Sequence, residues 1–305
     1  MIKTMKKIIL TAFVVFISIS PSFAAEADEK LPNMAASELK TGISHMTRAG
    51  IDREAATRFT QVMLEYGFSL ENARSAQEIV IRSHGQGLLV GPVMNKAYEG
   101  MAKGIEQENI IQAMNNVMAR YGFASQQTGE LTQREVQKKR IMEQIAECVA
   151  AGVSEYDAGR LVYQLKHRTQ EMPKDEADNL AIETFRALKD IARLRVRSMK
   201  ATDLAVEALK HHYGTREMTR MRKSFMKHAR DTSPNTVADG YFNAIQRGNR
   251  LENLDFLSLK GTGKSGSKGS SAGSGHGATG TGSGGSHGGG SGSAGRGSGG
   301  SKGGR

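Results

Sequence analysis

The densest group of side chains that could bind a ligand is a run of arginines and lysines late in the chain. Residues 186–230 hold 13 basic and 4 acidic residues, whereas residues 25–185 hold 18 basic and 23 acidic ones. Guanidinium and ammonium groups bind phosphate and carboxylate oxygens through charge-assisted hydrogen bonds. The candidate anion-binding residues of this block are Arg193, Arg195, Arg197, Lys200, Arg220, Arg222, Lys223 and Lys227.

Three interpretations of this basic block are open. Its charges can be solvated faces of ordinary helices, some of them paired with the acidic first part of the chain. They can bind an anionic polymer or a membrane surface, because Met218, Met221 and Phe225 share a helical face opposite the basic residues, as in interfacial helices. They can bind nucleic acid, but only Tyr213 and Phe225 lie inside the block to stack on bases, which disfavours this partner.

The remaining polar residues predict no catalytic, cofactor or metal site. The chain has no His-Glu-x-x-His motif, and Glu207 with His211 supplies two of the three or more ligands that a zinc ion needs. Its one cysteine, Cys148, shares an apolar stripe with Ile141 and Ile145. Such a cysteine is typical of a core position.

Glu99 is the one candidate for a catalytic acid, in the manner of a cell-wall hydrolase. The segment 96–104 lacks, however, the serine after the glutamate and the Gly-Leu-Met-Gln stretch that mark lytic transglycosylases. We therefore expect Glu99 to form ion pairs with Lys96 and Lys103 on a solvated helix face.

Helices must position all of these side chains. Between Ile51 and Tyr66 the apolar residues follow a 3.6-residue period, and Gly67 ends that helix. Two pairs have the spacing of a capping box, Thr132 with Glu135 and Ser154 with Asp157. Alternating, β-branched runs are missing apart from the short stretch 254–259, so the sequence predicts an all-α fold.

The helices recur in units of roughly 50 residues, which start near residues 50, 104, 152 and 198. The first two units both close on a Tyr-Gly-Phe triplet, at residues 66–68 and 121–123. Such repeats predict stacked helix pairs, in a solenoid-like helical repeat or in an irregular helical bundle.

The two ends of the chain have compositions of their own. Residues 1–24 resemble a signal peptide, with three lysines, a 13-residue apolar stretch and a cleavage site after Ala24. Residues 25–47 then form an N-terminal extension, 48–250 the helical domain and 251–260 a short apolar connector. Residues 261–305 contain 21 glycines, 11 serines and five basic residues, which predicts a disordered tail.

These features together predict an exported protein, periplasmic or extracellular, with no membrane span after signal cleavage. We expect a non-enzymatic interaction or scaffold protein of the bacterial cell envelope, with an envelope protein or anionic polymer as partner. The alternatives are a binder of anionic polymer or membrane surface through residues 186–230 and the tail, and a cell-wall hydrolase.

Overall fold

The computed structural model describes residues 33–248, with side chains from residue 37 onward. The predicted signal peptide, its cleavage site near Ala24, the connector and the Gly/Ser tail lie outside the described residues. The chain divides into two units, 1–262 and 263–305, and all the described residues belong to the first. Within residues 33–248 the fold is all-α, as predicted.

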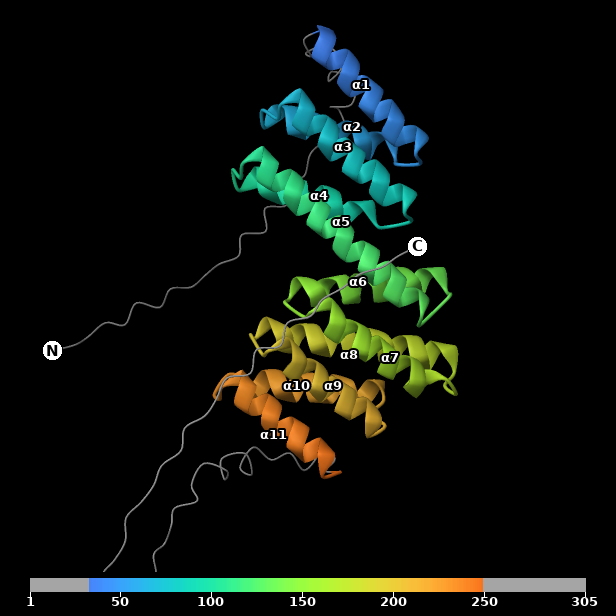
Figure 1. The fold of residues 1–305 in the computed structure, drawn as a ribbon, viewed down its shortest axis with the longest axis vertical. Helices are drawn as coiled ribbons and strands as arrows, with labels where there is room; N and C mark the ends of the chain where they lie inside the picture. Colours follow the sequence, from blue (N-terminus) through green and yellow to red (C-terminus); the bar gives the residue numbers. More distant parts are fainter. Residues whose placement is uncertain (1–32, 249–305) are drawn as a thin grey trace, which may run out of the picture. The chain divides into compact units, whose positions relative to one another are not determined.

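This part of the chain contains eleven helices (Figure 1). In chain order they are α1 (Asn33–Arg48), α2 (Arg53–Glu65), α3 (Leu70–Gly85), α4 (Val90–Ala102), α5 (Gln107–Gly129), α6 (Glu135–Ala150), α7 (Glu155–Thr169), α8 (Lys174–Arg193), α9 (Ser198–Lys210), α10 (Thr215–His228) and α11 (Pro234–Gln246). None of these helices has the length and apolar character of a membrane span.

Most of the turns between helices share one backbone motif. A residue with positive φ follows the helix, and the next N–H group bonds back to a carbonyl in the last turn. Gly67 has φ 73°, and the Phe68 N–H donates to the Met63 carbonyl oxygen at 2.9 Å. The apolar residue after the glycine, here Phe68, is buried against the core. The motif satisfies the carbonyls that a helix leaves unpaired at its end and fixes the direction of the next helix.

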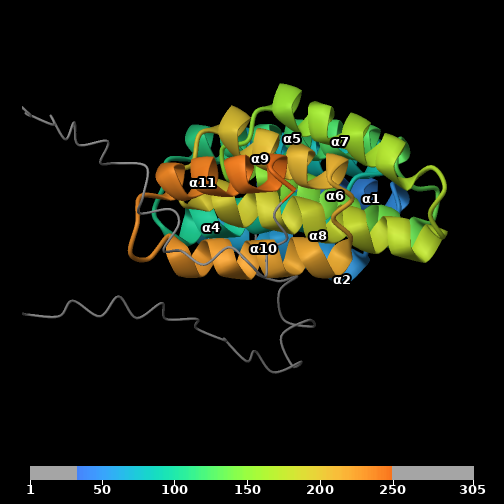
Figure 2. The same cartoon turned by 90° about the horizontal axis from the view of Figure 1, so that it is seen from below.

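The helices stack so that each packs mainly on helices one or two positions away along the chain. The odd-numbered helices contact one another in series from α1 to α11, and α6, α8 and α10 form a second series. Figure 2 shows α7 and α9 on one side of this stack and α8 and α10 on the other. This arrangement is a solenoid-like stack of helix pairs, in which each pair buries the apolar faces of the next.

The longest helix, α5, lies between helices α1–α4 and helices α6–α11 in the stack (Figure 1). It has 23 residues and packs on α3 and α4 on one side and on α6 and α7 on the other. Gly100 of α4 allows a close approach here, because a Cβ atom at this position would lie 2.6 Å from Ile110 Cγ1 of α5. The contact between α4 and α5 therefore depends on a residue without a side chain.

Two details differ from the sequence-based expectations, and a third agrees with them. The helical domain begins before residue 48, because α1 occupies residues 33–48 and buries Leu39 and Met46. Thr132 is not the N-cap of α6: Arg134 holds that position, and the Thr132 hydroxyl accepts the Arg134 N–H at 3.3 Å. Ser154 does cap α7, as predicted, by accepting the Asp157 N–H at 3.1 Å.

The repeat is also shorter than the roughly 50 residues expected. Helix pairs begin at the first residues of α2, α4, α6, α8 and α10, and these lie 37 to 45 residues apart. The units expected from the sequence do not coincide with these helix pairs. Gly50 precedes α2, the first helix of a pair, whereas Gly104 and Gly152 precede α5 and α7, the second helices of their pairs. The same glycine turn thus follows both the first and the second helices of pairs, so its recurrence does not give the length of the repeat.

Candidate functional site

The structure divides the eight predicted anion-binding residues into two groups. Two of them hold helices together. Arg222 of α10 lies 2.9 Å from Glu183 and 3.0 Å from Asp190, both on α8. Lys200 of α9 lies 2.7 Å from Asp239 of α11. These two cations are used in the packing of the stack.

The other six predicted residues have exposed side chains. Arg193 ends α8, and Arg195 and Arg197 lie in the turn before α9. Arg220, Lys223 and Lys227 lie on the outer face of α10. The structure therefore does not bring the predicted set together in one pocket.

The apolar face of α10 is used for packing. Met218, Met221 and Phe225 are fully buried, and the ring of Phe225 meets that of Tyr241 of α11 at a centroid distance of 5.6 Å. An interfacial helix needs this face to enter the lipid. The lipid-facing helix, one of the three interpretations of the sequence, is therefore not available in the folded stack, and only the basic face of α10 meets solvent.

A groove lies on the surface where α6, α8 and α10 meet, and it has a volume of about 430 Å³. Three arginines from three helices line it, together with two glutamates on α8. Its lining residues are Arg140, Glu176, Asn179, Ile182, Glu183, Arg186, Thr215 and Arg216. None of the eight predicted residues is among them.

The electrostatics of this groove centre on Glu183, whose side chain is 7% exposed. Its carboxylate meets Arg186 Nη1 at 2.9 Å and Arg222 Nε at 2.9 Å. Burial opposes the charged form of Arg222, but hydrogen bonds to Glu183 and Asp190 outweigh it and raise the pKa of the guanidinium. Two guanidinium groups thus face Glu183, and because Arg222 also pairs with Asp190, the charges of these two arginines and two carboxylates balance.

A second surface lies on α7, in the other layer. Tyr156 and Tyr163 are 77% and 64% exposed, and they occupy the helix face opposite the buried Leu161 and Leu165. Arg160 lies between them and is held by Asp203 of α9 at 2.8 Å. The Tyr163 ring meets His167 edge-on at a centroid distance of 4.5 Å. We call Tyr156, Arg160, Tyr163 and His167 the α7 stripe.

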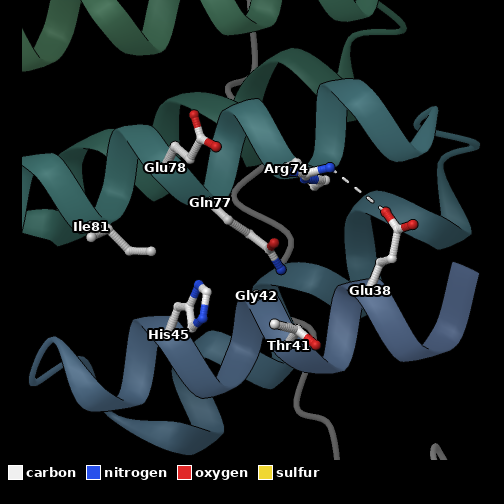
Figure 3. Close-up of a pocket in the computed structure, with 8 residues that line it drawn as sticks. All are labelled: Glu38, Thr41, Gly42, His45, Arg74, Gln77, Glu78 and Ile81. Carbon is white, nitrogen blue, oxygen red and sulfur yellow. Dashed lines mark ion pairs between the residues drawn. The ribbon is translucent and has the colours of Figure 1, made fainter.

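A smaller pocket of about 210 Å³ lies between α1 and α3 (Figure 3). Arg74 and Glu38 form an ion pair at its rim, 3.7 Å apart, and Gln77 points at Gly42. The buried Gln77 amide donates to Thr60 Oγ1 of α2 at 2.8 Å. Gln77 therefore joins α3 to α2, and the ion pair at the rim joins α3 to α1.

Glu99 has the surroundings of a surface ion pair. Lys103 and Lys96 both donate to its carboxylate, and these hydrogen bonds lower its pKa to about 2. A general acid in glycoside hydrolysis needs the opposite shift, so that the carboxyl group keeps its proton near neutral pH. The structure thus gives Glu99 properties that do not suit catalysis by a cell-wall hydrolase.

Cys148 lies in the core, and His211, the C-cap of α9, lies beside Glu207 of that helix, as the sequence indicated. The Cys148 thiol is fully buried and donates to the Phe185 carbonyl oxygen at 3.0 Å, and burial raises the pKa of the thiol. His211 Nε2 lies 3.4 Å from Glu207 Oε1. Among residues 37–248, no group of three or more metal-binding side chains comes together.

Sequence reasoning missed both surfaces. The α7 stripe was detectable, because Tyr156 and Tyr163 are seven residues apart on the polar side of an otherwise regular amphipathic helix. The groove was not, since Arg140 comes from α6, outside the basic block, and joins Arg186 and Arg216 only through the packing of α6, α8 and α10. Searches with this chain against models of protein families, curated proteins and solved structures found no match.

Proposed function

We propose that this protein is a non-enzymatic interaction scaffold, exported to the bacterial cell envelope, which binds a partner protein through the α7 stripe. The signal-peptide pattern of residues 1–24 supports the location. The observation that carries the proposal is the exposure of two tyrosines on one helix face, with an arginine between them. Tyrosine and arginine supply much of the binding energy in protein interfaces.

The geometry of the stripe supports this role. Arg160 is fixed between Asp157 and Asp203, at 3.3 and 2.8 Å, and Tyr163 rests against His167. Side chains that are already ordered lose less conformational entropy when a partner binds. The start of α9 is tied to the start of α7, because the Ser198 hydroxyl accepts the Ser154 N–H, and the next residue, Met199, is 60% exposed.

The test is a crosslinking experiment on the exported protein in living cells. A photo-reactive phenylalanine analogue replaces Tyr156, Tyr163 or, as the matched control, Tyr66, which is 54% exposed on a different part of the stack. We expect one protein to be crosslinked from positions 156 and 163 and not from 66, and Y156A/Y163A to lose it in pull-downs. The proposal is wrong if the three positions give the same products, or if Y156A/Y163A retains its partners.

A further inference from the structure

The groove between α6, α8 and α10 combines positive charge with groups that can bind a peptide backbone. Arg140 and Arg216 are exposed, and the Arg186 side chain is 40% exposed while it contacts Glu183. Arg186 and Arg222 balance Glu183 and Asp190. Among the lining residues this leaves the positive charges of Arg140 and Arg216, opposed by Glu176. The groove therefore attracts anions.

We propose that this groove binds an acidic peptide segment of a protein partner, with its carboxylates on Arg140, Arg186 and Arg216. A guanidinium group binds a carboxylate through two parallel hydrogen bonds, so three arginines from three helices select a peptide with spaced acidic side chains. The site lies in the opposite layer from the α7 stripe. The proposal does not depend on that stripe.

The rest of the lining favours a peptide over a uniformly charged polymer. A polymer with a phosphate or sulfate on every unit must place one of these groups beside Glu176, which repels it. A peptide can place a neutral residue or an N–H donor beside Glu176 instead. The Asn179 side chain can donate and accept hydrogen bonds with a peptide backbone. Ile182, which is 4% exposed, supplies an apolar floor for one side chain.

The size of the groove and an unpaired hydroxyl group support the same ligand. A volume of about 430 Å³ lies within the range of ligand sites and accommodates a few residues of an extended peptide. Thr215 Oγ1, at the start of α10, is buried and has no hydrogen-bond partner within the described part of the chain. Because Thr215 lines the groove, its hydroxyl is a candidate donor to the backbone carbonyl of a bound peptide.

The experiment measures binding of a fluorescein-labelled twelve-residue peptide that carries four glutamates separated by leucine, serine and glycine. The reference peptide has glutamine in place of each glutamate. We expect the full chain to bind the acidic peptide at least about tenfold more tightly than the reference peptide, with an affinity that falls as salt rises. R140Q/R216Q is expected to weaken this binding about tenfold or more.

Two further variants make the result specific to the groove. K223Q/K227Q removes the same charge from the outer face of α10 and is expected to change the affinity less than about twofold. E176Q removes the opposing carboxylate and is expected to strengthen binding, a gain that cannot come from misfolding. The proposal fails if the acidic peptide does not bind, or if both double variants weaken binding equally. It also fails if polyphosphate binds more tightly than the peptide.

Discussion

Arg222 Nε lies 2.9 Å from Glu183 Oε1 and so joins α10 to α8 through a carboxylate that is almost wholly buried. R222A leaves that carboxylate with Arg186 as its remaining cation, in a place that water barely reaches. We expect the free energy of unfolding to fall by about 2–3 kcal/mol. Urea denaturation followed by circular dichroism measures this loss.

The matched control is K103A, which removes one cation from the exposed ion pair with Glu99. Exposed pairs contribute little, so the expected loss is below about 0.5 kcal/mol. Equal losses from R222A and K103A would show that the α8–α10 contact does not depend on this pair.

The close contact between α4 and α5 predicts opposite effects for two glycine substitutions. In G100A the new methyl group overlaps Ile110, which is fully buried, and we expect a loss of about 1–3 kcal/mol. G122A adds a methyl group in α5 where no atom lies within 4 Å apart from the neighbouring residues and the backbone of the helix itself. Alanine favours the helix there, so this variant should gain about 0.5–1 kcal/mol. Thermal unfolding of both variants checks the signs.

Two of the turns that contain a positive φ angle have an ordinary residue at that position, where the others have glycine. Arg195 has φ 63° and His212 has φ 61°. This left-handed conformation strains a residue that has a Cβ atom, so R195G and H212G should each stabilise the chain by up to about 1 kcal/mol. Q112G, in the middle of α5, is the control and should lose about 1 kcal/mol. A loss in all three variants would show that the turns are not strained.

Asp157 predicts a pH dependence of stability. Burial alone would raise the pKa of this carboxyl group, but hydrogen bonds from Ser198, Ser154 and Arg160 outweigh burial and hold it below its ordinary 3.8. The folded chain thus binds the proton less tightly than the unfolded chain, so Asp157 adds stability above pH 4, about its ordinary pKa, and loses it as pH falls through the folded-state pKa.

We therefore expect D157N to cost about 1–2 kcal/mol at pH 7 and distinctly less at pH 3. Urea unfolding at both pH values measures the difference. E155Q, in the same helical turn but exposed, should have an effect below about 0.5 kcal/mol at either pH. A loss from D157N that stayed the same from pH 7 to pH 3 would contradict this account.

The buried Cys148 thiol predicts slow alkylation. Its pKa is raised by burial, and the thiolate is the reactive form. We expect iodoacetamide to leave the folded chain unmodified over a time in which the chain in 8 M urea reacts fully, as measured by mass spectrometry. A disulfide-linked dimer formed by the folded protein in air would contradict the buried position.

Signals between residues close in the sequence predicted the helices well. The features that the sequence did not predict depend on contacts between distant residues. Ser154 caps α7 because the residues involved are three apart, and the period of apolar residues predicted the helices correctly. Thr132 does not cap α6; the N-cap residue is Arg134, whose side chain pairs with Asp178 of α8, 44 residues away. The groove could not be predicted from the sequence either, since its arginines come together only when α6, α8 and α10 pack.

The spacing of the turn glycines indicates the length of the single helices better than the expected 50-residue repeat does. Gly50, Gly67, Gly87 and Gly104 all have positive φ and follow one another at intervals of 17 to 20 residues. An apolar residue follows each of them in the sequence. This two-residue pattern marks single helices, and two such intervals give the length of a helix pair.

The neighbour-to-neighbour packing of the helices has a kinetic consequence. Because helices pack mainly on those one or two positions away, most native contacts join residues close in the sequence, and the chain has a low contact order. Closing the short loops between such residues costs little entropy, so folding should proceed quickly from any helix pair that forms first. Unfolding should likewise start at an end of the stack, where a helix has neighbours on one side only, and native-state hydrogen exchange should show graded protection that rises from α1 and α11 toward α5 and α8.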